Sequence, residues 1–169
     1  MIPLGLFLLD FADNARRGVV WDSLWMCQLA NLLMGLGVLL ERPYVVRMGV
    51  LWIVAGTPLW LRELTLDPTI APVSYLSHLG GLAFAIYWLR QGKQNGAPVW
   101  LEAWLFFVAV RLACGWLTPA ALNINASHSA RDVVGLAFWQ YWLVTTLVGA
   151  ACLYLVDVGL RALTSSAPQ

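Results

Sequence analysis

The longest apolar stretch of the sequence is VVGLAFWQYWLVTTLVGAACLYLVDVGL, residues 133–160, in which Asp157 is the one charged residue. A helix needs about 20 apolar residues to cross the hydrocarbon core of a bilayer. Lipid offers no partner to the backbone, so a stretch of this length must satisfy its own backbone groups, as a helix does. The stretch therefore predicts a transmembrane helix.

Four shorter apolar runs precede it, each ending at charged or turn-forming residues. They span about residues 19–40, 44–61, 72–89 and 98–117. The connections between runs are 15 residues or fewer, which leaves no room for a separate soluble domain. We therefore expect residues 1–169 to form a single all-α integral membrane domain, a polytopic bundle of about five transmembrane helices.

The N-terminal run, residues 1–10, has no basic segment before it and no small-residue cleavage site after it, so it does not resemble a signal peptide. It is also too short to span a bilayer. It predicts a short helix that lies at the membrane interface or packs on the bundle.

Composition agrees with a membrane protein and excludes several other classes. The chain is 60% hydrophobic and 11% charged, against about 25% charged residues in a soluble domain. Ten Lys/Arg and nine Asp/Glu are scattered along it, which argues against a nucleic-acid partner. Three cysteines without paired spacing indicate neither a disulfide framework nor a metal site. We expect no cofactor, and we expect the cell membrane as location, with membrane lipids and other membrane subunits as partners.

Tryptophans cluster near the ends of the predicted spans, where indole rings favour the membrane interface. We interpret six of them as interfacial anchors: Trp21, Trp52, Trp60, Trp88, Trp100 and Trp139.

Polar residues of four predicted spans fall at similar depth. Counting from the N-terminal side at about 1.5 Å per residue, Cys27 lies roughly 12 Å and His78 roughly 9 Å into the membrane. Arg111 and Gln140 fall in the same leaflet. Polar groups within spans face the bundle interior or a water-filled cavity. The depths predict a small polar cavity opening toward the N-terminal side.

Helical spacing adds two residues to this predicted cavity. Asn31 follows Cys27 by four residues and shares its stripe with Gln28, and Ser74 precedes His78 by four. A histidine can take the proton of a thiol and so make it nucleophilic. Cys27 beside His78 would then attack a lipid ester, with Arg111 on the phosphate or the amide of Asn31 on the oxyanion.

Each of these residues also has a purely structural interpretation. A free cysteine often fills space as a small apolar side chain. Arg111 can pair with Asp22 or extend toward the head groups. Asn31, Gln28 and Ser74 can join helices by hydrogen bonds.

The same residues resemble a known family. The sequence has WMCQL at 25–29, GTPLW at 56–60, Ser77-His78 and then Asn123-Ile124-Asn125. This order is similar to that of the YwaF-type integral membrane proteins, over about residues 21–125. That family is related to membrane acyltransferases acting on phospholipids and to the androgen-induced hydrolases of fatty-acid esters of hydroxy fatty acids. The resemblance implies Cys27 as nucleophile and His78 as base.

Three functions are therefore open at this point. The first is a lipid acyltransferase or ester hydrolase with a Cys27/His78 pair. The second is a non-catalytic transmembrane subunit of a larger complex. The third is a haem or quinone site at His78. The other histidine, His128, falls in a polar loop, so the sequence does not favour ligation of haem by two histidines.

Overall fold

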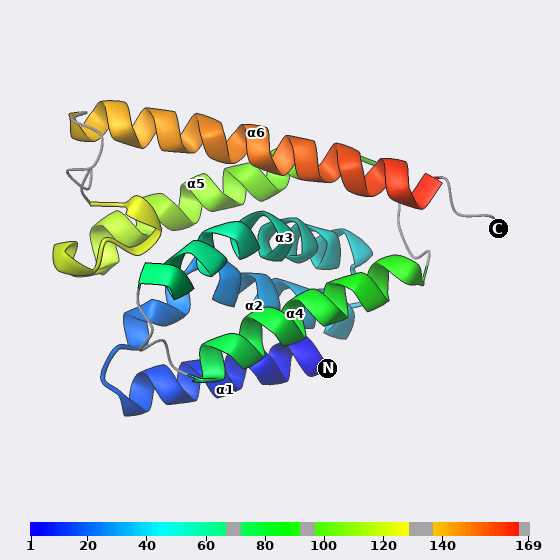
Figure 1. Cartoon of the computed structure of the whole chain (residues 1–169), viewed down its shortest axis with the longest axis horizontal. Coiled ribbons are helices and arrows are strands. Elements are labelled where there is room, and N and C mark those ends of the chain that lie inside the picture. Colours follow the sequence, from blue (N-terminus) through cyan, green and yellow to red (C-terminus); the bar gives the residue numbers. More distant parts are fainter. Residues whose placement is uncertain (67–71, 92–96, 129–136, 166–169) are drawn as a thin grey trace.

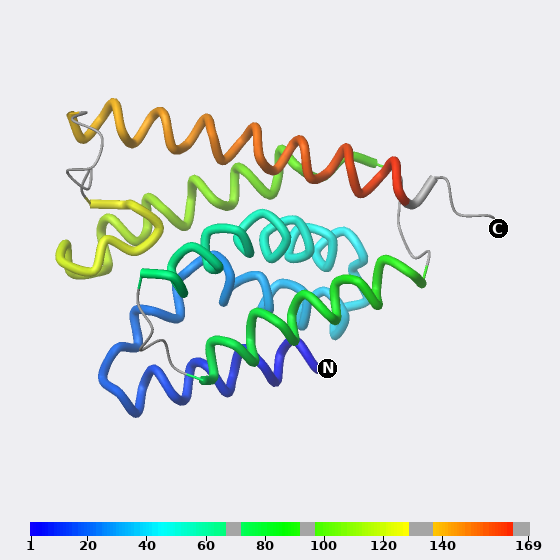
Figure 2. The backbone as a smooth tube through the Cα atoms, viewed as in Figure 1, coloured from blue at the N-terminus to red at the C-terminus, as the bar shows by residue number. Residues whose placement is uncertain are grey.

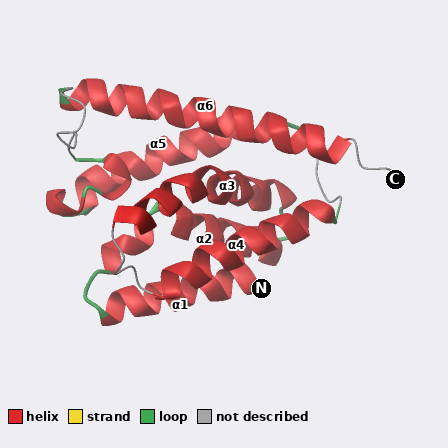
Figure 3. Cartoon of the chain, viewed as in Figure 1, coloured by secondary structure: helices red, strands yellow, loops and turns green. Residues whose placement is uncertain are grey.

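The computed structural model describes residues 1–66, 72–91, 97–128 and 137–165, and its described elements are all helices (Figures 1 and 3). The α-helices are α1 (Ile2–Arg16), α2 (Met26–Leu39), α3 (Pro43–Leu66), α4 (Pro72–Arg90), α5 (Trp100–Leu117) and α6 (Phe138–Ser165). Three 3₁₀ turns complete the described elements: η1 (Val20–Leu24), η2 (Ala120–Leu122) and η3 (Ile124–Ala126). The predicted all-α helical bundle is confirmed.

Consecutive α-helices run in alternating directions (Figure 2). As a result, η1, the start of α4 and η3 gather at one end of the bundle, which we call the η3 end, while the N-terminus and the end of α6 lie at the other. Helices α5 and α6 pack together on one side of α3, and α1 packs against α2 and α4 on the other (Figure 1).

Helix α3 is the central helix of the bundle. Every residue from Val46 to Ile53 is buried, so this part of the helix is covered on all sides, as expected of a core helix. Glycines let α2 approach it closely: a Cβ added at Gly49 would lie 2.6 Å from the Ala30 carbonyl oxygen, and one at Gly37 would lie 2.6 Å from the Val46 nitrogen. The backbones of α2 and α3 therefore touch.

Three helices are long and apolar enough to cross a membrane, namely α3, α5 and α6. Three helices of this length and composition are typical of an integral membrane protein. Helix α2 has 14 residues and covers about 21 Å, less than the roughly 30 Å of a hydrocarbon core.

The prediction of one continuous helix over residues 19–40 is wrong. Trp25 interrupts it with an extended backbone (ψ 140°), which separates η1 from α2. Polar contacts from other elements stabilise this break: Asn14 of α1 donates to the Ser23 hydroxyl, and Asn125 of η3 accepts from the Met26 amide. At this break the Ser23 hydroxyl and the Met26 amide therefore form hydrogen bonds with side chains of other elements, in place of bonds within one continuous helix.

The other boundaries lie close to the predicted ones. Helix α4 ends one residue later and α5 begins two residues later than expected, while α3 and α6 each extend five residues further. The predicted start of the last span, residues 133–136, lies outside the described residues. The N-terminal run forms a longer helix than expected, and it packs on the bundle through Leu4 at Gly35 of α2 and Leu6 at Gly80 of α4.

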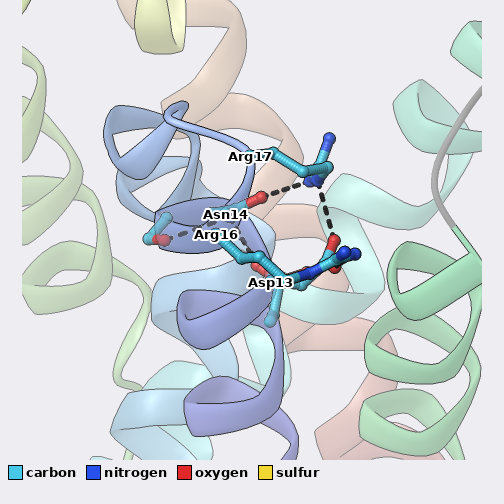
Figure 4. A network of polar contacts seen from close by, with 6 residues as sticks. Asp13, Asn14, Arg16 and Arg17 are labelled. Atoms are coloured by element: carbon cyan, nitrogen blue, oxygen red, sulfur yellow. Dashed lines mark hydrogen bonds and ion pairs between the residues drawn. The ribbon is translucent and has the colours of Figure 1, made fainter.

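A polar network joins the end of α1 to η1 (Figure 4). Asn14 donates to Asp10 Oδ2 at 3.0 Å and to Ser23 Oγ at 3.1 Å, and all three residues are buried. Arg17 donates to Asp13 at 2.8 Å and also to Asn14. Burial raises the pKa of Asp10 to about 6, against the opposing effects of the Arg17 charge and the Asn14 hydrogen bond.

Candidate functional site

Cys27 lies at the start of α2 and faces α3. A Cβ added at Gly56 would lie 2.6 Å from the Cys27 Sγ atom, so the thiol occupies the space that any larger residue at position 56 would need. Cys27 itself is half-buried. Gly56 thus provides the room in which the thiol sits against α3.

His78 of α4 also faces α3, one helical turn further along. Its ring stacks on Trp60, with centroids 4.4 Å apart and planes 8° from parallel. Its Nδ1 lies 2.8 Å from the Ser74 carbonyl oxygen, which can only accept, so Nδ1 carries the proton. In this tautomer Nε2 is the nitrogen able to accept a proton.

Trp60 and Ser74 hold this histidine from two sides. The indole Nε1 of Trp60 donates to Ser74 Oγ at 3.2 Å, and the same hydroxyl lies 3.4 Å from His78 Nδ1. Trp60 is 7% exposed, so the prediction that it is an interfacial anchor is wrong, and the same is true of the buried Trp52 and Trp88. A tryptophan near a span end can therefore belong to the core.

Asn31 joins the helix of Cys27 to the helix of His78. Its Nδ2 donates to the Ser77 carbonyl at 3.1 Å and, more weakly, to the Cys27 carbonyl at 3.5 Å. These two carbonyl oxygens are therefore at most 6.6 Å apart, the sum of the two distances. We call the group Cys27, Asn31, Ser74 and His78, which surrounds Gly56 and Trp60, the α2–α3–α4 junction.

Arg111 lies in a second group, between α5, η3 and α6. Its guanidinium is buried; Nε and Nη2 donate to the Ala126 carbonyl at 3.2 and 2.7 Å, and Nη1 donates to Thr146 Oγ1 at 2.8 Å. It also donates to the Trp142 carbonyl and lies 4.9 Å above the Trp142 ring. The ion pairs found in the described part of the chain do not include one between Arg111 and Asp22.

Gln140 makes a local contact at the start of α6. Its side-chain oxygen accepts a hydrogen bond from the Ala137 amide at 3.1 Å, three residues earlier. This is half of a capping box, which satisfies an amide that the first helical turn leaves without a partner. The described contacts therefore bring Cys27, Asn31, Ser74 and His78 into one group. Arg111 of α5 and Gln140 of α6 make their contacts outside this group.

Asn125 connects the α5–α6 side of the η3 end to the start of α2. Its Oδ1 accepts from the Met26 amide at 3.1 Å, and its Nδ2 donates to the Leu24 carbonyl at 2.8 Å and lies 3.7 Å from Cys114 Sγ. Its φ is +53°, a left-handed conformation that asparagine tolerates better than most residues. The residue preceding Cys27 is therefore held by a turn almost 100 positions away.

Asn125 belongs to the stretch that carries the family resemblance, but the sequence alone does not indicate these contacts. His128, which the sequence places in a polar loop, makes contacts of its own: its Nε2 lies 2.9 Å from Thr118 Oγ1, and its backbone amide donates to Asn123. A cluster of turn-forming asparagines after Pro119 was the available signal, since asparagine often bonds nearby backbone.

Among the described residues, no group of three or more His, Cys, Asp or Glu side chains is arranged to hold a metal ion. Comparison of the chain with known protein families, with curated proteins and with solved structures finds no match.

Proposed function

We propose that this chain is an integral membrane enzyme that transfers or hydrolyses the acyl group of a lipid ester, with Cys27 as nucleophile and His78 as base. One observation carries the proposal. The Cys27 thiol and the His78 ring contact Gly56 and Trp60, which lie four residues apart and so on one face of α3.

The histidine is also oriented as a base must be. A catalytic base is commonly held by a third group that fixes its tautomer, and here the Ser74 carbonyl accepts the Nδ1 proton. In the proposed reaction Nε2 takes the proton of the Cys27 thiol. No hydrogen bond joins these two groups among the described contacts, so the proposal requires the two side chains to approach each other when substrate binds. The stacked Trp60 ring limits rotation of the imidazole, so Ser74 and Trp60 act as positioning residues.

The reaction proceeds in two steps. The Cys27 S–H proton passes to His78, and the sulfur attacks the ester carbonyl carbon; a C–S bond forms, the C–O bond breaks, and the proton leaves with the released hydroxyl. The thioester is then attacked by water, which gives hydrolysis, or by the hydroxyl of a second lipid, which gives acyl transfer. The thiol is regenerated in both cases.

The remaining predicted residues support the site in this proposal. Asn31 already directs its amide at two carbonyls, so we assign it to holding α2 against α4 rather than to the oxyanion. Arg111 holds η3 and Gln140 caps α6. We keep the five predicted spans as part of this proposal: α4 is the fourth beside α3, α5 and α6, and η1 together with α2 is the fifth, because α2 alone covers only about 21 Å. The proposed location is the cell membrane, with membrane lipids as substrates.

The test is covalent labelling of the purified chain, residues 1–169, with an alkyne-tagged long-chain aryl ester. The variants are Cys27→Ser and, as a matched control, Cys152→Ser, because Cys152 is an exposed cysteine on α6. We expect Cys27→Ser to lose the label and Cys152→Ser to retain it. Equal labelling of wild type and Cys27→Ser removes the proposal.

A second pair of variants separates catalysis from packing. His78→Gln should slow labelling by about 10²- to 10⁴-fold. Gly56→Ala should also slow it, since the added Cβ would meet the sulfur, whereas Gly159→Ala has open space around it and should not. Normal labelling of Gly56→Ala would show that the thiol reacts from another position.

The alternative is a non-catalytic transmembrane subunit in which the junction serves only helix association. The hydrogen bonds from Asn31 to backbone carbonyls on two helices favour it. Size measurement of the purified chain in detergent discriminates, because a stable monomer with esterase or acyltransferase activity contradicts the subunit role.

A further inference from the structure

A cleft of about 540 Å³ opens between α5, η3 and α6 at the η3 end. Its lining includes Arg111, Gly115, Trp116, Ser127, Trp139 and Trp142. These residues are not part of the α2–α3–α4 junction. The cleft thus combines a cation, a hydroxyl and several indole rings in a place that the proposed catalytic residues do not use.

The charge of Arg111 is the first feature that points to a ligand. Arg111 is 1% exposed, and its described hydrogen bonds go to the neutral carbonyls of Ala126 and Trp142 and to the Thr146 hydroxyl. These bonds use four of the five guanidinium N–H groups and leave one on Nη2. A buried cation bonded to neutral groups favours an anionic ligand, and phosphate oxygens suit guanidinium best.

The Ser127 hydroxyl is the second feature, and it is independent of the first. Ser127 is 6% exposed, and its Oγ has no hydrogen-bond partner. Buried hydroxyls nearly always have a partner, and leaving one without a partner destabilises the folded chain. Because Ser127 lines the same cleft as Arg111, an acceptor bound there would satisfy both groups.

The cleft mouth indicates where the rest of the ligand lies. Trp116 is 89% exposed and Trp139 is 66% exposed, and exposed indoles at the end of an apolar helix favour the head-group region of a bilayer. Leu112, next to the cleft, is 50% exposed and offers an apolar surface for an acyl chain. A free anion would use none of this surface.

We propose that this cleft binds a membrane phospholipid, with its phosphodiester at Arg111 and Ser127 and an acyl chain along the apolar surface at Leu112. The site goes beyond the proposed acyl chemistry and does not depend on it. Binding there requires neither the Cys27 thiol nor the His78 ring.

Gly115 provides a way to fill the cleft without touching Arg111. A Cβ added there would meet Ser127 at 3.6 Å, an ordinary contact, so the side chain of Gly115→Leu would extend into the cleft. Gly159→Leu is the matched control, because Gly159 lies on an exposed part of α6 with nothing within 4 Å of its added Cβ. Ser127→Ala is a second, smaller change.

The experiment is lipid binding by native mass spectrometry in a neutral detergent. All variants carry Cys27→Ser, so that failure of the acyl chemistry cannot affect the result. The probes are phosphatidylglycerol, diacylglycerol with the same chains, and inorganic phosphate as competitor. We expect phosphatidylglycerol to bind more tightly than diacylglycerol, and Gly115→Leu and Ser127→Ala each to weaken it about tenfold or more, with Gly159→Leu unchanged.

Three results would overturn the proposal. Diacylglycerol binding as tightly as phosphatidylglycerol would mean that the phosphate is not recognised. Displacement of the lipid by equimolar inorganic phosphate would make the site one for a free anion. Phosphatidylglycerol affinity unchanged in both Gly115→Leu and Ser127→Ala would place the bound lipid elsewhere.

Discussion

A buried ion pair between Arg47 of α3 and Asp157 of α6 should dominate the stability of the contact between these helices. Arg47 Nη2 donates to Asp157 Oδ1 at 2.8 Å, and the two side chains are 2% and 0% exposed. Arg47 also donates to the Ala97 carbonyl, and Arg161 lies 3.3 Å from the other Asp157 oxygen. Asp157→Asn would keep the size of the side chain and remove its charge.

The expected cost follows from this geometry. At 2.8 Å, the attraction between two unit charges is about 6 kcal/mol for an effective dielectric constant of about 20. A hydrogen bond from Arg47 to the new amide would recover part of this attraction. Removing the charge of one partner of a buried ion pair typically costs about 3–5 kcal/mol. The partly exposed Arg161 contact adds about 0.5 kcal/mol. We expect Asp157→Asn to lower the free energy of unfolding by about 3–5 kcal/mol, which is roughly 10²- to 5 × 10³-fold in the unfolding equilibrium constant.

The assay is reversible unfolding in detergent, followed by far-ultraviolet circular dichroism. Glu63→Gln is the matched control, since its pair with Arg62 is exposed at both ends and should contribute less than about 1 kcal/mol. Replacing both partners by apolar residues, Arg47→Met with Asp157→Leu, should restore most of the loss. A cost of Asp157→Asn no larger than that of Glu63→Gln would refute the reasoning.

Two further predictions concern α1 and η3. The pKa of Asp10 is raised from 3.8 to about 6, so the folded state favours the protonated acid. The contribution of Asp10 to stability should therefore fall, by up to about 3 kcal/mol, as pH rises from about 4 to above about 6. Asp10→Asn should remove this part of the stability–pH curve. An identical slope in both proteins would contradict it. Asn125→Ala should cost about 2 kcal/mol and speed hydrogen exchange at the Met26 amide, because it removes bonds to Met26 and Leu24; unchanged exchange at Met26 would count against the capping role.

Helix type and most helix boundaries were predictable from sequence because they depend on local signals. Pro72 opens α4 and Thr118-Pro119 follows α5, as expected of residues that begin or stop helices. The break at Trp25 had no such signal. It depends on Asn14 and on Asn125, which contact this region only after the chain has folded.

The sequence was enough to predict how deep the candidate site residues lie in the membrane, but not which neighbouring helix each side chain faces. Counting residues places Cys27, His78 and Arg111 at similar levels, yet it cannot give the rotation of each helix about its axis. The described contacts show that Cys27 and His78 face α3 whereas Arg111 faces η3 and α6. Small residues such as Gly56 determine which faces meet, and their effect depends on the neighbouring helix.

The contacts of Asn125 have a consequence for covalent modification. Asn125-Ala126-Ser127 reads as an acceptor sequence for N-linked sugar, and the sugar would be attached to Nδ2. In the folded chain Asn125 is 8% exposed and Nδ2 is bonded to Leu24. A glycan could therefore be added only before η3 folds, and a glycosylated chain would lose the connection between η3 and the start of α2. Folding and glycosylation at this asparagine exclude each other.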